Sequence, residues 1–157
     1  MPKITLTDGS PVTPEHREID PKTGMQKDYV VLSEEERAKG FVRLVRNSYR
    51  HVGIPGPTYL LRDLTNEERK LYGDNYAKFE TYPEGSSRVG RFWTQKELDN
   101  IGKGCGVVTR MNAALSETYA RDPFFYDSTY CVHCKTHFPV GECGEFVWVD
   151  DNERVGT

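Results

Sequence analysis

The cysteine pair Cys131 and Cys134 is the strongest candidate for chemistry in this sequence. Its two-residue spacer lets both thiolates bind one tetrahedral ion from a tight turn, with bonds of about 2.3 Å to zinc. Cys105 is followed by Gly106, and a glycine after a ligand cysteine supports the same kind of turn. The spacing therefore predicts that Cys105, Cys131 and Cys134 are three ligands of one Zn²⁺ site.

A tetrahedral site needs a fourth ligand, and the sequence offers His51, His137 and Cys143. Spacing alone does not choose among these three residues. His133, between the paired cysteines, is expected to point outward. A site with four protein ligands has no open position for water, so the predicted zinc is structural and not catalytic.

A redox pair and a set of buried apolar residues are the alternatives to a zinc site for these cysteines. A Cys-x-x-Cys redox pair needs a helix N-terminus that lowers the pKa of its first thiol, but residues 135–141 lack a helical period and include Pro139 and Gly141. All four cysteines could also be buried apolar residues. No P-loop, dinucleotide-binding or H-E-x-x-H motif is present, so we name no catalytic residue.

The composition predicts a small protein whose hydrophobic core needs further stabilisation. The chain has 157 residues, of which 36% are hydrophobic, and we expect one domain over residues 1–157 that metal cross-linking supplements. Its net charge of -3 argues against a generic polyanion binder. No run approaches the ~20 apolar residues that span a bilayer, so we expect a cytoplasmic protein without a membrane partner. Reduced cysteines in that compartment favour metal binding over disulfides.

The expected fold class is α+β, a small antiparallel sheet with a zinc-ribbon-like centre. The main helix is predicted over residues 110–121, with Thr109 as its cap, from apolar residues at helical spacing. Short helices are predicted after Ser33, Thr65 and Thr94, each three residues before a glutamate that completes a capping box. Residues 29–32, 41–46 and 145–150 read as strands, 79–93 as an aromatic ordered loop and 1–26 as a proline-rich arm.

Basic residues alternate along the predicted strand and just beyond it. Arg43, Arg46 and Arg50 lie in a segment without acidic residues and could face phosphates or another partner on one surface. The alternative is a solvated edge strand that positive charge protects from aggregation.

A family resemblance adds to this reading. The motifs Glu117–Pro123 (ETYARDP), Cys131–Cys134, His137–Val140 (HFPV) and Glu145–Trp148 (EFVW) resemble a family of small uncharacterised phage-associated proteins that look like zinc ribbons. Its shorter members run from histidine to cysteine as H-x-x-C-G. The resemblance implies that His51 and Cys105 are two halves of one zinc knuckle, which residues 54–102 split as an insertion.

We expect an accessory protein that binds a protein or nucleic-acid partner, with zinc as a structural element. The resemblance implies the phage association, and the cysteine spacing implies the metal. One alternative is a virion component whose arm, residues 1–26, orders on a neighbouring subunit of an oligomer. Another is a thiol or zinc-dependent enzyme. The expected location is the host cell cytoplasm or the virion.

Overall fold

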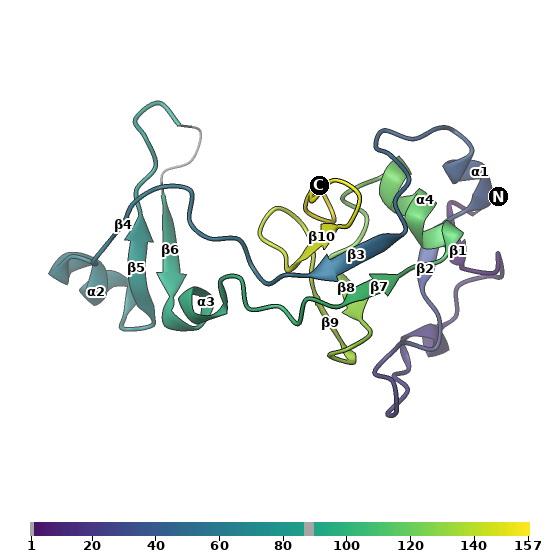
Figure 1. Cartoon of the computed structure of the whole chain (residues 1–157), viewed down its shortest axis with the longest axis horizontal. Helices are drawn as coiled ribbons and strands as arrows, with labels where there is room; N and C mark the ends of the chain where they lie inside the picture. The colour runs from purple at the N-terminus through teal and green to yellow at the C-terminus, as the bar shows by residue number, and fades with distance from the viewer. Residues whose placement is uncertain (1, 87–89) are drawn as a thin grey trace. The chain divides into compact units, whose positions relative to one another are not determined.

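A computed structural model describes residues 2–86 and 90–157 of the chain (Figure 1). The chain forms two compact units, of which the first comprises the residues up to Val52 and from Gly104 onward. The second unit, Gly53–Lys103, covers nearly the same residues as the expected insertion, 54–102. Both units combine short helices with small antiparallel sheets, which confirms the α+β class. A zinc-ribbon-like centre stays a prediction.

The core of the first unit lies on a three-stranded antiparallel sheet. Strand β3 (Ser48–His51) lies between β10 (Phe146–Trp148) and β7 (Val108–Arg110). Its Tyr49 is paired with Trp148 on one side and Thr109 on the other. Tyr49 and Trp148 are almost fully buried, and their rings meet edge to face. Burial of such large rings contributes most of the apolar stabilisation of a small core.

Helix α4 (Ala113–Arg121) packs its buried residues, including Tyr119, against this core. The prediction of a main helix is correct, but its start is wrong, because Asn112 and not Thr109 is the cap. The Asn112 side chain accepts the Leu115 N–H at 2.9 Å. Thr109 belongs to β7 instead, where its hydroxyl accepts the Val132 N–H at 3.0 Å. An asparagine satisfies the first free amides of a helix as well as a threonine does.

The paired cysteines lie on a β-hairpin made of β8 (Ser128–Cys131) and β9 (Thr136–Pro139). The turn between the strands closes with a hydrogen bond of 2.9 Å from the Lys135 N–H to the Cys131 carbonyl. Lys135 adopts a left-handed backbone conformation, with φ of 56°. This tight turn brings Cys134 back towards Cys131.

The N-terminal arm lies against its own unit. Strand β1 (Ile4–Leu6) pairs with β2 (Val30–Leu32), and a 3-10 helix, η1 (Pro14–Arg17), lies between them in sequence. The Tyr130 hydroxyl donates to the Thr23 carbonyl, and the Tyr29 hydroxyl lies 2.9 Å from His137 Nε2. The arm is therefore ordered by contacts with the hairpin that carries the cysteines.

The predicted strand over residues 41–46 is wrong. The amides of Val42 and Arg43 both donate to the Ala120 carbonyl near the end of α4, and the strand begins only at Ser48. The short helix α1 (Glu34–Arg37) is confirmed, since the Ser33 hydroxyl accepts the Glu36 N–H at 3.3 Å. The last carbonyls of a helix have no partner within the helix, so they can accept N–H groups from a segment that is distant in sequence. Sequence periodicity does not reveal such a contact.

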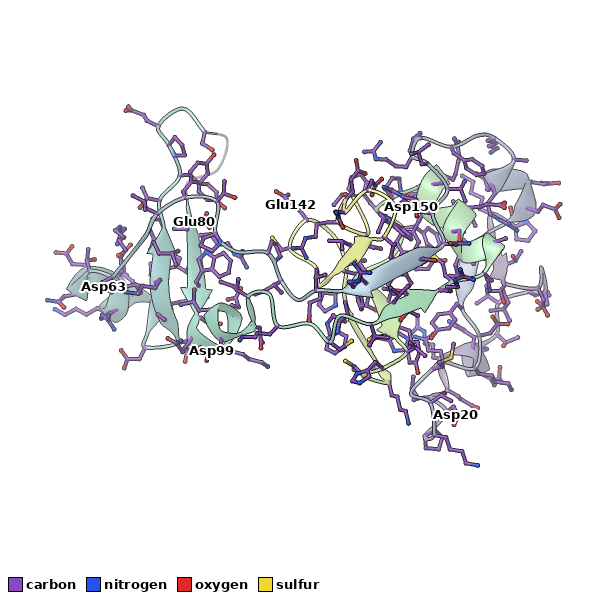
Figure 2. The ribbon with its side chains drawn as sticks, in the orientation of Figure 1. Asp20, Asp63, Glu80, Asp99, Glu142 and Asp150 are labelled. Carbon is purple, nitrogen blue, oxygen red and sulfur yellow. The ribbon has the colours of Figure 1, made fainter. Side chains whose placement is uncertain are left out.

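The second unit has its own sheet of β4 (Leu61–Arg62), β5 (Tyr76–Glu80) and β6 (Arg91–Thr94), with helices α2 (Asn66–Tyr72) and α3 (Gln95–Asn100). The capping boxes at Thr65 and Thr94 are confirmed. The expected loop over 79–93 is wrong at both ends, because Phe79 and Phe92 are cross-strand partners. Figure 2 shows Glu80 at the end of β5, where its carboxylate accepts the Trp93 indole N–H at 3.0 Å.

Candidate metal centre

The structure brings one histidine and three cysteines into a single cluster. The ligand atoms of His51, Cys105, Cys131 and Cys134 all lie within 4.8 Å of one another. Cys105 Sγ is 3.5 Å from Cys131 Sγ, and Cys134 Sγ is 3.5 Å from His51 Nδ1. Ligands at the corners of a tetrahedron, about 2.3 Å from a central ion, stand roughly 3.7 Å apart. The cluster could therefore hold a metal ion with little rearrangement.

Two pieces of backbone structure bring distant ligands together. His51 ends β3, and its carbonyl accepts the Gly106 N–H at 2.8 Å, which places Cys105 beside it although 54 residues separate the two. Cys131 ends β8, and the hairpin turn returns Cys134 to the same place. The pairing of β3 with β7 thus brings His51 and Cys105 together, and the hairpin turn brings Cys131 and Cys134 together.

Glu145 orients the imidazole of His51. Its carboxylate oxygen Oε1 lies 2.9 Å from His51 Nε2, so a proton on Nε2 is shared with the carboxylate and Nδ1 is left as the acceptor. Nδ1 accepts the Cys105 N–H at 3.4 Å and faces the sulfur atoms. The ring also stacks on Phe138 at a centroid distance of 4.4 Å. A carboxylate behind a histidine is the usual support of a metal ligand. This role of Glu145 is not predictable from local sequence, because its partner His51 lies 94 positions away in the chain.

The cluster affects the ionisation of its thiols in opposite directions. Burial acts to raise the pKa of Cys105, but hydrogen bonds from Val107, His51 and the other two cysteines outweigh burial and lower that pKa to about 7. Burial, and then the neighbouring Cys131 and Cys105, raise the pKa of Cys134 to about 12. Without a metal ion, ionisation of the Cys105 thiol thus disfavours ionisation of the Cys134 thiol. A divalent cation would stabilise several thiolates at once.

The remaining candidates for the fourth ligand lie outside this cluster. His137 is next to the Tyr29 hydroxyl, and burial lowers its pKa. Cys143 and His133 are exposed. Among the residues that the structure describes, His51 is the histidine that joins the three cysteines.

The basic residues do not form one open surface. Arg46 is only 5% exposed and forms ion pairs with Asp151 at 2.7 Å and Glu153 at 2.8 Å. Arg43 is exposed and donates to the Thr157 carbonyl, and Arg50 is half-buried in β3. The acidic partners of Arg46 follow it by more than 100 residues, so the local sequence did not reveal them.

Comparisons of the chain with protein-family models, with curated proteins and with solved structures found no match. No helix within residues 2–86 and 90–157 has the length and apolar character needed to cross a bilayer.

The geometry of the cluster permits one kind of chemistry best. Four side chains would fill the four positions around a tetrahedral ion and leave none open for water or substrate. Cys131 is fully buried, and His51 is 3% exposed, so neither group is accessible to a dissolved substrate. The arrangement therefore suits an ion that holds the fold together.

Proposed function

We propose that this protein binds one structural Zn²⁺ through His51, Cys105, Cys131 and Cys134. The observation that carries the proposal is the approach of one imidazole nitrogen and three sulfurs within 4.8 Å of one another. Thiolate and imidazole ligands in a tetrahedral arrangement favour zinc over magnesium or calcium, which prefer oxygen. The ion joins β3, β8 and the segment after the second unit, so it stabilises the first unit as a whole.

On this zinc-supported fold we propose an accessory protein that acts by binding another protein. The resemblance to small phage-associated proteins supports the setting, as part of a phage-encoded function in the host cell. The burial of Arg46 leaves less positive charge for nucleic acid. Ordering of the arm on a neighbouring virion subunit stays a prediction from the sequence.

Matched substitutions test the metal site. We expect Cys131→Ser to lose the bound zinc and the cooperative thermal transition together, since structural zinc binding contributes about 10–16 kcal/mol in small zinc domains. Cys143→Ser is the control, because it removes an exposed thiol outside the cluster. In the same way, His51→Ala should lose zinc and His137→Ala should retain it. Equal zinc content in Cys131→Ser and Cys143→Ser would refute the site.

A further inference from the structure

The first unit contains a second feature, a cavity of about 140 Å³ that none of the four metal ligands lines. Its walls come from the arm, β3, β7, α4 and β8. Met111 and Leu115 contribute apolar side chains. The lining also includes a group of tyrosines, namely Tyr29, Tyr49, Tyr119, Tyr126 and Tyr130. This cavity, the tyrosine chamber, is thus distinct from the metal centre.

The hydroxyls at the buried end of the tyrosine chamber already have partners in the protein. Tyr49 and Tyr130 are 2% and 6% exposed. The Tyr49 hydroxyl donates to the Tyr130 carbonyl at 2.5 Å, and the Tyr130 hydroxyl donates to the Thr23 carbonyl. Burial raises the pKa of Tyr119, and a hydrogen bond with Thr129 opposes this rise. These hydroxyls therefore need no ligand to satisfy them.

The other two tyrosine hydroxyls are also engaged. Tyr126 donates to the Val30 carbonyl at 2.6 Å, and the Tyr29 hydroxyl lies 2.9 Å from His137 Nε2. A water molecule buried in a cavity needs about two to four polar partners. Because the tyrosine hydroxyls are engaged with the protein, the chamber offers few partners to water or to a polar ligand. An apolar occupant is therefore favoured.

The charged residues of the described chain do not select an ion for the chamber. Arg110 is part of the lining, but it pairs with Ser48 across the strands, whereas the adjacent Thr109 pairs with Tyr49. Side chains alternate between the two faces of a sheet, so the Arg110 side chain lies on the face opposite Tyr49 and Thr109. Among residues 2–86 and 90–157, no aspartate or glutamate lines the chamber. A charged ligand would lose its hydration there without gaining an ion pair.

We propose that the tyrosine chamber binds a small uncharged aromatic molecule of about the size of benzene or toluene. Its volume is close to the ~150 Å³ of an apolar protein cavity that binds benzene. A planar ring meets tyrosine faces and edges, and such contacts contribute stabilisation beyond area burial. Rings of tyrosines also bind organic cations, but those sites gain from nearby carboxylates, which the described lining lacks. This site is independent of the proposed metal and partner binding.

The test uses the full chain as purified and follows the NMR chemical shifts of the tyrosine ring protons. Toluene is the probe, and benzoate and benzylamine are the anionic and cationic comparisons with the same ring. We expect toluene to shift the lining tyrosines and to bind about tenfold or more tightly than either charged compound, which must give up hydration. No shift with toluene, or an equal or higher affinity for benzoate or benzylamine, would overturn the proposal.

Two substitutions at Leu115 test the location of the site. Leu115→Trp should fill the chamber and abolish the toluene shifts, and Leu44→Trp, at a residue that is 74% exposed and outside the lining, is the control. Leu115→Ala should enlarge the chamber, so naphthalene should bind this variant more tightly than it binds the unsubstituted protein. Zinc content and a thermal melt check the folding of each variant. Equal toluene binding in Leu115→Trp and Leu44→Trp, or unchanged naphthalene binding in Leu115→Ala, would contradict the location.

Discussion

Replacing Gly24 by alanine is expected to detach the N-terminal arm from the β8–β9 hairpin. Gly24 has a φ of 75°, and its Cα faces the backbone of Lys135. An added Cβ would lie 2.6 Å from the Lys135 carbonyl carbon, where no flexible side chain can move aside. The backbone of either the arm or the hairpin turn must therefore shift.

The cost follows from two separable contributions. A non-glycine residue in the left-handed region costs roughly 1–2 kcal/mol. A forced backbone shift costs about 1–3 kcal/mol more, as in overpacked cores. Gly9→Ala is a matched control, because Gly9 also lies in the arm, has a φ of 89°, and its Cβ would meet nothing within 4 Å. The control isolates the conformational strain, so the difference between the two variants measures the contact.

Amide hydrogen exchange measures detachment where it occurs. In the arm the Gly24 N–H donates to the Asp20 carbonyl and the Asp20 N–H to the Met25 carbonyl, both at 2.8 Å, and Figure 2 labels Asp20 there. We expect Gly24→Ala to speed exchange at both amides and to lower the free energy of unfolding in urea more than Gly9→Ala does. Equal effects of the two substitutions would show that the arm does not rest on Lys135.

Two further predictions concern the second unit. Glu80→Gln should destabilise this unit by about 1–3 kcal/mol, because the buried carboxylate accepts the N–H groups of Thr58, Tyr59 and Trp93 and an amide cannot accept all three. Faster hydrogen exchange at the Thr58 and Tyr59 amides would show the loss, and Glu84→Gln, at an exposed position, is the control. Unchanged exchange at these two amides in Glu80→Gln would contradict the prediction. A hydrogen bond from Arg62, and then one from the Thr65 N–H, lower the pKa of Glu68 to about 2. The pKa of Glu68 is higher in the unfolded chain, so its interaction with Arg62 stabilises α2 above about pH 4.5 and is lost as the pH falls towards 2. An NMR titration should show α2 weakening over this range. The same pH dependence in a Glu68→Gln variant would show that Glu68 is not its cause.

Local sequence signals predicted those features whose causes are local. The capping boxes at Thr65 and Thr94 are complete within four residues, and both helices form where expected. The Cys-x-x-Cys turn also encodes its own geometry, since four residues suffice to place Cys131 and Cys134 together. Such signals need no information from the rest of the chain.

Features that depend on distant partners were harder to predict. Spacing did not choose among His51, His137 and Cys143, because the position of His51 depends on the register of β3 with β7. The family resemblance implied His51, which is the histidine found in the cluster. Residues 41–46 have the composition of a strand but bind the end of α4, and the acidic partners of Arg46 lie more than 100 residues away. Tertiary contacts override local propensity at such places.

The metal content of the purified, untagged protein, measured together with thermal melts in the presence and absence of a chelator, tests the central claim most directly. We predict one equivalent of zinc per chain and a cooperative melt that the chelator abolishes or shifts to a much lower temperature. A protein without bound metal, with three reactive thiols at Cys105, Cys131 and Cys134 and a melt that the chelator leaves unchanged, would contradict the account.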